Sequence, residues 1–228
     1  MNRQILAAVA ACASISIAAP AAAATPRELL MSAAFGSPDK ATALARIEAG
    51  LKAADALLAR NKGDREAQLQ RAVAISYRGK LKRNRADLLT ARRELEALVA
   101  ANPGNAEAQA ALGGWHLGAV TNVGAMVART ALGARKLVGL KALDRSVALS
   151  GGRAFFPAFA SLTRIMLDPA DVAGARRLAE AAVKARVDGP MDRIMQARAS
   201  TLLKALSTGD GKAAAKTAKT LMPFGRFG

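Results

Sequence analysis

One short pattern occurs twice in this chain and limits what the chain can fold into. Residues 61–68 and residues 102–109 both read Asn-x-Gly-x-x-Glu-Ala-Gln, 41 positions apart. Both copies also follow an Ala-Leu pair, at residues 56–57 and 97–98. Asn and Gly end helices and form turns, whereas Glu-Ala-Gln favours the start of a helix. A duplicated helix-turn-helix joint of this kind predicts a stack of helical repeats.

The composition agrees with a fully helical domain. Apolar residues make up 52% of the 228 positions, aromatic residues only 4%, and alanine supplies much of the apolar share. Small side chains favour helices and let them approach closely, and no stretch shows the alternation of a strand. Charged residues at 22% argue against bulk disorder. We therefore predict an all-α fold of about nine or ten helices in antiparallel pairs, forming one domain over residues 25–221.

The first 24 residues are typical of a secretory signal peptide. Arg3 supplies the positive start, residues 5–19 are apolar and uncharged, and residues 21–24 are four alanines. Small residues at this place suit signal cleavage, which we expect close to Thr25. The sequence therefore predicts a periplasmic or secreted protein, with no transmembrane segment after cleavage. A retained membrane anchor is the alternative.

Cys12 is the only cysteine and lies inside the predicted signal peptide. If the peptide is removed, the exported protein has neither a disulfide nor a free thiol. Residues 9–12, Val-Ala-Ala-Cys, resemble a lipobox, so lipidation of Cys12 is a second alternative. Only four apolar residues precede that box, fewer than the roughly seven of a signal hydrophobic region, and we therefore expect an unlipidated protein.

The chain is strongly basic. Its formal net charge of +17 falls by one, to +16, when Arg3 leaves with the signal peptide. Such an excess favours anionic partners. Because an exported protein rarely meets cellular nucleic acid, we do not expect nucleic acid as a partner. An acidic envelope component, either a phosphate-bearing surface or an acidic protein, suits the charge and the compartment better.

Helix caps and apolar stripes predict where the helices lie. Residues 25–28, Thr-Pro-Arg-Glu, form a capping box with proline in the first turn, while Asp64 and Asn105 are N-caps. Glycines weaken or kink the helical pattern over residues 113–139, and residues 222–228 are predicted to be a loose C-terminal tail. Four leucines on apolar stripes are expected to be buried between helices, namely Leu51, Leu95, Leu98 and Leu112.

The second joint resembles the tetratricopeptide repeat (TPR). Asn102-Pro103, Glu107-Ala108 and Leu112-Gly113 follow the family's order of turn, helix start and Leu-Gly pair. The fit is convincing over about residues 50–118 only, and the joints lie 41 residues apart instead of the family's 34. The chain also resembles, in architecture and compartment, the T-component of periplasmic TRAP transporters. These resemblances imply a superhelix whose concave face binds a protein, peptide or small ligand.

The resemblance also implies where a ligand would bind, because the first helix of each TPR pair faces the groove. Aligning the two joints places Glu66, Gln70, Val73 and Tyr77 beside Glu107, Ala111, Gly114 and Gly118. Tyr77 would offer a ring and a hydroxyl, while the two glycines would leave room for a guest. These positions, together with the neighbouring Trp115 and His116, form the predicted binding site.

Trp115 and His116 occur once each in the chain and are adjacent. They lie about 100° apart on a helix, so both cannot point into one groove. We expect Trp115 to pack against the second helix of its pair and His116 to be the one nearer a ligand. The alternative is that both are ordinary packed or surface residues. A lone histidine without cysteines cannot make a usual zinc site.

A second candidate is an anion-binding patch in the predicted loop near residue 83, formed by Lys80, Lys82, Arg83 and Arg85. The alternative is a solvated turn. No aromatic residue interleaves with these cations, as a single-stranded nucleic-acid platform would require.

The sequence contains no phosphate-binding loop, dinucleotide fingerprint or nucleophile elbow, and we therefore expect neither an enzyme nor a cofactor or metal. The sequence predicts an exported TPR-like scaffold that binds its partner in a helical groove. The alternative is a basic protein that binds anionic envelope surfaces or polyanions by electrostatics.

Overall fold

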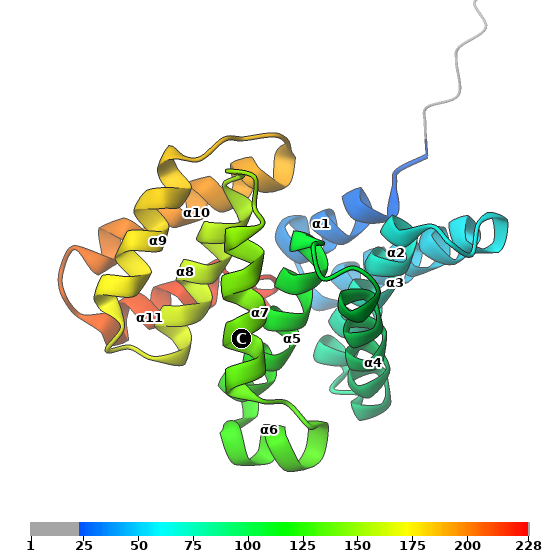
Figure 1. Ribbon diagram of the computed structural model, residues 1–228, viewed down its shortest axis with the longest axis horizontal. Coiled ribbons are helices and arrows are strands. Elements are labelled where there is room, and N and C mark those ends of the chain that lie inside the picture. The colour runs from blue at the N-terminus through cyan, green and yellow to red at the C-terminus, as the bar shows by residue number, and fades with distance from the viewer. Residues whose placement is uncertain (1–22, 228) are drawn as a thin grey trace, which may run out of the picture.

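The computed structural model describes residues 23–227 of the chain. The predicted all-α fold is confirmed for this range, in which no β-strand occurs (Figure 1). Its eleven α-helices and one short 3-10 helix are α1 (Pro26–Gly36), α2 (Lys40–Arg60), α3 (Arg65–Lys82), α4 (Arg85–Ala101), α5 (Ala106–Val123), α6 (Ala125–Leu132), α7 (Lys136–Ala148), α8 (Phe155–Leu167), α9 (Val172–Lys184), α10 (Pro190–Leu206), α11 (Gly211–Leu221) and η1 (Gly225–Phe227).

The duplicated sequence pattern forms the same turn twice. The Oδ1 atoms of Asn61 and Asn102 accept hydrogen bonds from the glycine N–H two positions on, at 3.0 and 3.2 Å. The Nε2 atoms of Gln68 and Gln109 donate to the carbonyl oxygen of the residue after each asparagine, at 2.8 and 3.1 Å. The repeated residues therefore specify the helix-turn-helix joint through local hydrogen bonds.

The helices form two layers. Helices α1, α3, α5, α8 and α10 each contact the next member of this series, and we call them the inner layer. Helices α2, α4, α7, α9 and α11 each pack against the inner helices beside them in the chain. The N-terminal half, in blue and cyan, and the C-terminal half, in yellow and red, lie on either side of α5 and α7 in Figure 1.

The glycine-rich region explains why the structure has more helices than the nine or ten predicted. Gly124 and Gly133 have positive φ angles of 81° and 68°, a conformation that side-chain-bearing residues rarely adopt. These two residues lie at the two ends of α6. Within the described chain, α6 packs mainly against α5 and α4. The glycines that were predicted to weaken the helix thus delimit a short extra helix, α6, which is inserted between the paired helices α5 and α7.

The leucine stripes are buried to different degrees. Leu95 and Leu112 lie in a core that spans α3 to α7, as predicted. Leu51 and Leu98 are only partly buried and pack against the edge of the same core, so the prediction of full burial is wrong for these two. A helical stripe is wider than the surface that one neighbouring helix covers, and its marginal residues remain partly exposed.

The C-terminal segment is not the loose tail that the sequence predicted. Phe224 is only 4% exposed and belongs to a core with Leu30, Ile47 and Leu81 of α1, α2 and α3. Its backbone N–H donates to the carbonyl oxygen of Ala34 at 3.0 Å. Burial of one aromatic ring holds the segment against the N-terminal helices, a long-range contact that no local pattern indicates.

The predicted signal peptide, with Cys12, lies almost wholly outside the described residues.

The capping box that directly follows it does form. The Oγ1 atom of Thr25 accepts from the N–H of Glu28 at 3.2 Å, and Glu28 accepts from the N–H of Thr25 at 2.8 Å. Helix α1 therefore begins immediately after the predicted cleavage position. Between residues 23 and 227, no helix combines the length and hydrophobicity needed to cross a membrane.

Candidate functional site

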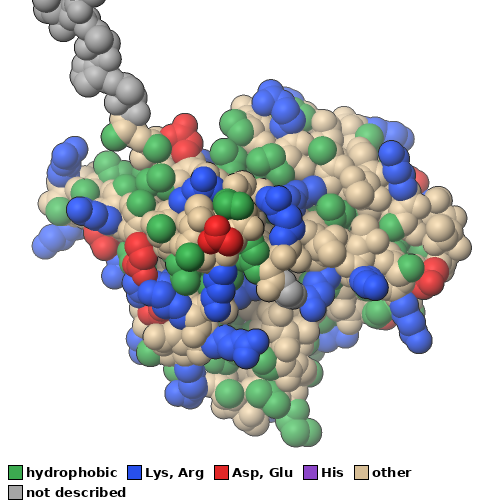
Figure 2. Space-filling model, turned by 180° about the vertical axis from the view of Figure 1, so that it is seen from behind, with side chains coloured by type: hydrophobic (Ala, Val, Ile, Leu, Met, Phe, Trp, Pro, Cys, Tyr) green, Lys and Arg blue, Asp and Glu red, His purple; other side chains and the backbone are tan. Residues whose placement is uncertain are grey.

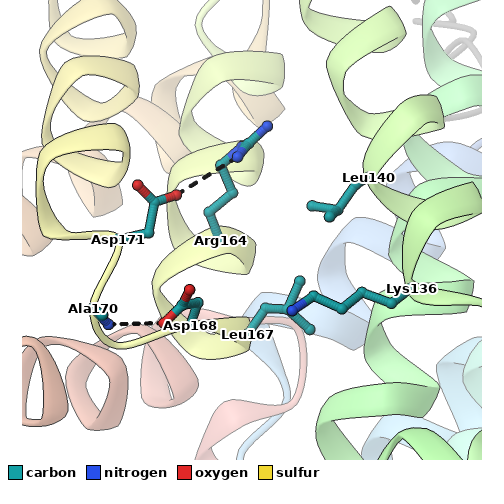
Figure 3. A pocket seen from close by; sticks show the side chains of 7 residues that line it. All are labelled: Lys136, Leu140, Arg164, Leu167, Asp168, Ala170 and Asp171. Carbon is teal, nitrogen blue, oxygen red and sulfur yellow. Dashed lines mark hydrogen bonds and ion pairs between the residues drawn. The ribbon is translucent and has the colours of Figure 1, made fainter.

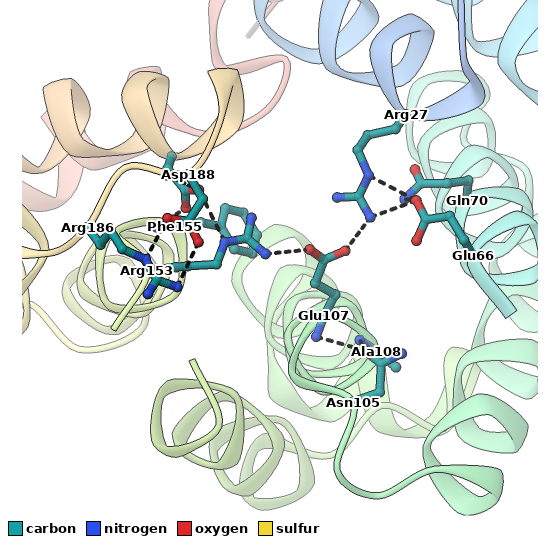
Figure 4. A network of polar contacts seen from close by, with 11 residues as sticks. Arg27, Glu66, Gln70, Asn105, Glu107, Ala108, Arg153, Phe155, Arg186 and Asp188 are labelled. Atoms are coloured by element: carbon teal, nitrogen blue, oxygen red, sulfur yellow. Dashed lines mark hydrogen bonds and ion pairs between the residues drawn. The ribbon is translucent and has the colours of Figure 1, made fainter. Parts of the chain in front are cut away.

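The N-terminal ends of the inner helices carry a network of ion pairs. Glu66 and Glu107, the equivalent glutamates of the two joints, both bind Arg27 of α1 (Figure 4). The Arg27 Nη2 atom lies 2.6 Å from Glu66 Oε1 and 2.5 Å from Glu107 Oε2. Gln70 also donates to Glu66 Oε1, at 3.0 Å. The structure therefore brings the predicted residues Glu66, Gln70 and Glu107 together around one arginine.

The same network continues into the C-terminal half. Glu107 Oε1 accepts from Arg153 Nη1 at 2.9 Å, and Arg153 Nε lies 3.1 Å from Asp192 Oδ2 (Figure 4). Asp192 is fully buried and also accepts from the backbone N–H groups of Phe155 and Asp188, at 3.0 and 3.2 Å. The network thus connects the starts of α1, α3, α5, α8 and α10.

The electrostatics of this network favour the charged forms. Burial acts to raise the pKa of Glu107, but hydrogen bonds and charge attraction from Arg27 and Arg153 outweigh it and lower the pKa. Burial acts to lower the pKa of both arginines, and their carboxylate partners raise it. Because each of these charges is already paired, the predicted ligand contacts at Glu66, Gln70 and Glu107 join the repeats to each other.

Trp115 and His116 lie in the core instead of on an open face. Trp115 is 6% exposed and lies in the same core as Leu95 of α4, the second helix of the preceding pair. His116 is 2% exposed, and its Nδ1 accepts from the backbone N–H of Arg135 at 3.2 Å. Burial first, then the charges of Arg92 and Arg135, lower the His116 pKa to about 4. His116 is therefore a neutral packing residue, and the prediction that it faces a ligand is wrong for this conformation.

The space expected beside Gly114 is occupied. A Cβ atom at Gly114 would lie 2.8 Å from the ring of Phe159, whereas Gly118 has open space around it. Phe159 stacks on Phe155 with ring centroids 5.8 Å apart, and both rings pack partly against the C-terminal core. Gly114 thus allows α5 and α8 to approach each other, and it leaves no room for a guest.

Tyr77 contacts the chain's own C-terminal segment. Its ring meets the ring of Phe224 edge to face, with centroids 4.9 Å apart. Burial raises the pKa of Tyr77 to about 12. Lys80, one turn further along α3, donates to the carbonyl oxygen of Pro223 at 3.2 Å. We call residues 222–227 the docked tail.

The four cations of the predicted anion patch have separate contacts. Besides Lys80, Lys82 pairs with Glu48 at 2.9 Å, and Arg85 donates to the carbonyl oxygen of Ala131 at 2.8 Å. Arg83 ends α3 in a left-handed conformation with a φ of 54°. Lysine and arginine side chains are also spread over the face seen in Figure 2. Three of the four cations therefore have partners within the chain, although all four stay exposed.

A small apolar cavity lies beside the docked tail. Its volume is about 230 Å³, and Met31 and Phe35 of α1 face Ile194 and Arg198 of α10 across it. The Arg198 guanidinium lies 4.2 Å from the centroid of the Phe35 ring. Arg226 of the tail donates to the Phe35 carbonyl oxygen at 2.5 Å. The two ends of the inner layer thus approach each other where the tail docks.

A second hollow lies outside the inner layer, between α7 and α8 (Figure 3). Its volume is about 320 Å³, and Arg164 at its wall lies 2.5 Å from Asp144 and 3.6 Å from Asp171. Lys136 reaches it from the start of α7. The walls combine charges of both signs: Arg164 is paired with carboxylates, whereas Lys136 has no ion pair within the described residues.

Sequence reasoning did not identify Arg27, Arg153, Asp192 or Phe224 as members of these sites. Arg27 and Arg153 belong to no repeated motif, and their partners lie far away in the chain. Comparison with protein-family models, with curated proteins and with solved structures finds no match.

Proposed function

We propose that this protein is an exported helical-repeat scaffold that binds a short, turn-forming peptide segment of a partner on the inner layer. One observation carries the proposal. The chain's own residues 222–227 already occupy the ends of α1 and α3, around the predicted ligand residue Tyr77. A surface that holds one such segment has the contacts to hold another of similar chemistry.

The docked tail indicates what kind of segment this surface accepts. An aromatic ring packs on Tyr77, the Ala34 carbonyl accepts from a backbone N–H, and Lys80 donates to a backbone carbonyl. Two of these three contacts involve the backbone of the bound segment and would suit many sequences. The contact of the aromatic ring with Tyr77 supplies the sequence preference. Because the tail itself forms a turn and a 3-10 helix, the expected ligand is a short turn-forming segment with an aromatic residue.

The apolar cavity between α1 and α10 extends the same surface. Met31, Phe35 and Ile194 line it next to the docked tail. A longer partner segment would place a second apolar side chain there. Peptide binding on the inner helices also agrees with the resemblance to the TPR family. The predicted signal peptide supports a partner in the periplasm or outside the cell, and the proposed role is binding without catalysis.

Competition with the docked tail tests the proposal. A labelled peptide of residues 221–228 is titrated into the whole protein and into its Phe224→Ala variant, and binding is followed by fluorescence polarisation. Because the tail is tethered, it competes at a high effective concentration. We expect the variant to bind at least about tenfold more tightly than the wild type.

The matched control is the same peptide with Ala in place of Phe224, which should not bind. Circular dichroism of the variant verifies that the helices remain folded. A folded variant that binds neither peptide, or both equally, would contradict the proposed aromatic pocket. Binding should also tolerate moderate salt, whereas a polyanion binder would lose affinity steeply.

A further inference from the structure

Exposed apolar side chains gather at one end of the molecule. Five of the seven large hydrophobic residues that are exposed in the described chain lie between residues 123 and 138. Met126 is 79% exposed and Leu137 is 76% exposed. We call the five residues the apolar tip; they are Val123, Met126, Val127, Leu137 and Val138.

The local fold explains why these residues face water. On α6, Ala128 and Leu132 pack into the core beside Trp115, so Met126 and Val127 lie on the opposite face. Helix α6 is an insertion outside the two layers and projects below α5 and α7, at the middle of the stack, in Figure 1. Leu137 follows at the start of α7, and no described helix covers it.

Unpaired cations lie close to the apolar tip along the chain. Arg129, Arg135, Lys136 and Lys141 are exposed, and their side chains have no ion pair or hydrogen bond within residues 23–227. No Asp or Glu occurs between Glu107 and Asp144. This segment therefore has a local charge of one sign, in contrast to the paired charges of the inner layer.

We propose that the apolar tip docks on an anionic phospholipid surface, with its aliphatic side chains among the acyl chains and its cations at the headgroup phosphates. Exposed aliphatic residues together with lysine and arginine are the features of proteins that lie in a membrane interface. The lower end of the molecule in Figure 2, where α6 lies, shows such apolar side chains in green.

A bilayer fits this end better than a folded protein does. The tip is a projection and not a groove, and a fluid bilayer can adapt to a projecting surface. No aromatic residue occurs between Trp115 and Phe155, so the apolar tip would insert aliphatic side chains only. Flexible cations interact favourably with an anionic leaflet without a matching pocket. This inference is independent of the proposed peptide binding.

Vesicle co-sedimentation of the whole protein tests the proposal. One set of vesicles is phosphatidylcholine alone, and another contains roughly one quarter phosphatidylglycerol. We expect binding to the anionic vesicles only. The double substitution Met126→Ser/Leu137→Ser should weaken it about tenfold or more, because two large apolar side chains no longer leave water. Arg135→Gln/Lys136→Gln should weaken it about fivefold per cation.

Matched variants on α11 distinguish docking at the tip from unspecific attraction. Lys212→Gln/Lys216→Gln removes two equally exposed cations far from α6 along the chain and should leave binding nearly unchanged. All variants share the same N-terminal segment, so its own apolar residues cannot account for differences between them.

Three results would overturn the proposal. The first is that the wild-type protein does not bind anionic vesicles, and the second is that the α11 variant weakens binding as much as the tip variants do. The third is that the serine variant still binds fully, which would mean attraction without insertion. If sedimentation velocity shows that the wild type forms dimers and the serine variant does not, the tip is instead an interface between two copies.

Discussion

The inner-layer network and the apolar tip use charged residues in opposite ways. In the network, every arginine binds two carboxylates, and the buried Asp192 accepts three hydrogen bonds. In the segment that carries the tip, four exposed cations have no carboxylate partner in the described chain and are close in sequence to exposed aliphatic side chains. Charges that are paired and buried specify how repeats join, whereas unpaired charges beside apolar groups are available to something outside the chain.

The comparison predicts the largest effect at Asp192. The substitution Asp192→Ala removes a fully buried carboxylate and leaves the Arg153 Nε and two backbone N–H groups without their acceptor. We expect it to lower the free energy of unfolding by about 3–5 kcal/mol. Urea denaturation followed by circular dichroism measures this. As a control, Asp210→Ala removes one exposed helix cap and should cost only about 1 kcal/mol. Equal losses for both variants would show that the buried network stabilises the fold no more than an exposed helix cap does.

A second prediction concerns pH and the contact beneath the tip. His116 has a pKa lowered from 6.5 to about 4, so the unfolded chain takes up a proton between these values while the folded protein does not. Protonation of His116 therefore costs the folded protein no free energy of unfolding well above pH 6.5. The free energy of unfolding decreases as the pH falls from 6.5 toward 4. Between pH 7 and pH 5 we expect a loss of about 2 kcal/mol from this residue.

Urea denaturation of the wild type and of His116→Gln at both pH values isolates the histidine contribution from that of the carboxylates. The glutamine variant should lose about 2 kcal/mol less than the wild type over this interval. The same dependence in both proteins would show that His116 is protonated as easily in the folded state as in the unfolded one.

A smaller effect is expected at the exposed margin of the network. Arg27→Met removes the partner shared by Glu66 and Glu107, but the arginine side chain is 39% exposed. Water therefore screens the lost attraction, and we expect a loss of about 1 kcal/mol. Lys82→Met, which breaks a single exposed pair with Glu48, should change the unfolding midpoint hardly at all. If neither variant changes the free energy of unfolding, only the buried part of the network around Asp192 contributes to stability.

The smallest effect on stability is expected at the tip. Met126→Ser and Leu137→Ser replace side chains that already face water, so each should change the free energy of unfolding by less than about 0.5 kcal/mol. Leu95→Ala in the buried core should cost about 2–5 kcal/mol in the same assay. A large loss at either tip position would indicate that these residues are packed in the folded protein, contrary to the comparison made here.

The sequence alone determined the features that depend on neighbours a few residues away. Helix caps at Thr25, Asp64 and Asn105 form as predicted. The duplicated pattern produces two equivalent turns, because Asn and Gln side chains bond to backbone groups within six residues. The all-α fold and the burial of Leu95 and Leu112 also follow from helical periodicity.

Only the tertiary structure decided which distant groups meet. The equivalence of Glu66 and Glu107 was visible in the sequence, but the arginine that binds both comes from α1. His116 was expected near a ligand, and the packing of α7 on α5 places it in the core. The residues after Leu221 have no helical pattern, and Phe224 is held by the ring of Tyr77. Such contacts depend on how whole helices are placed relative to each other, which local propensity and periodicity do not specify.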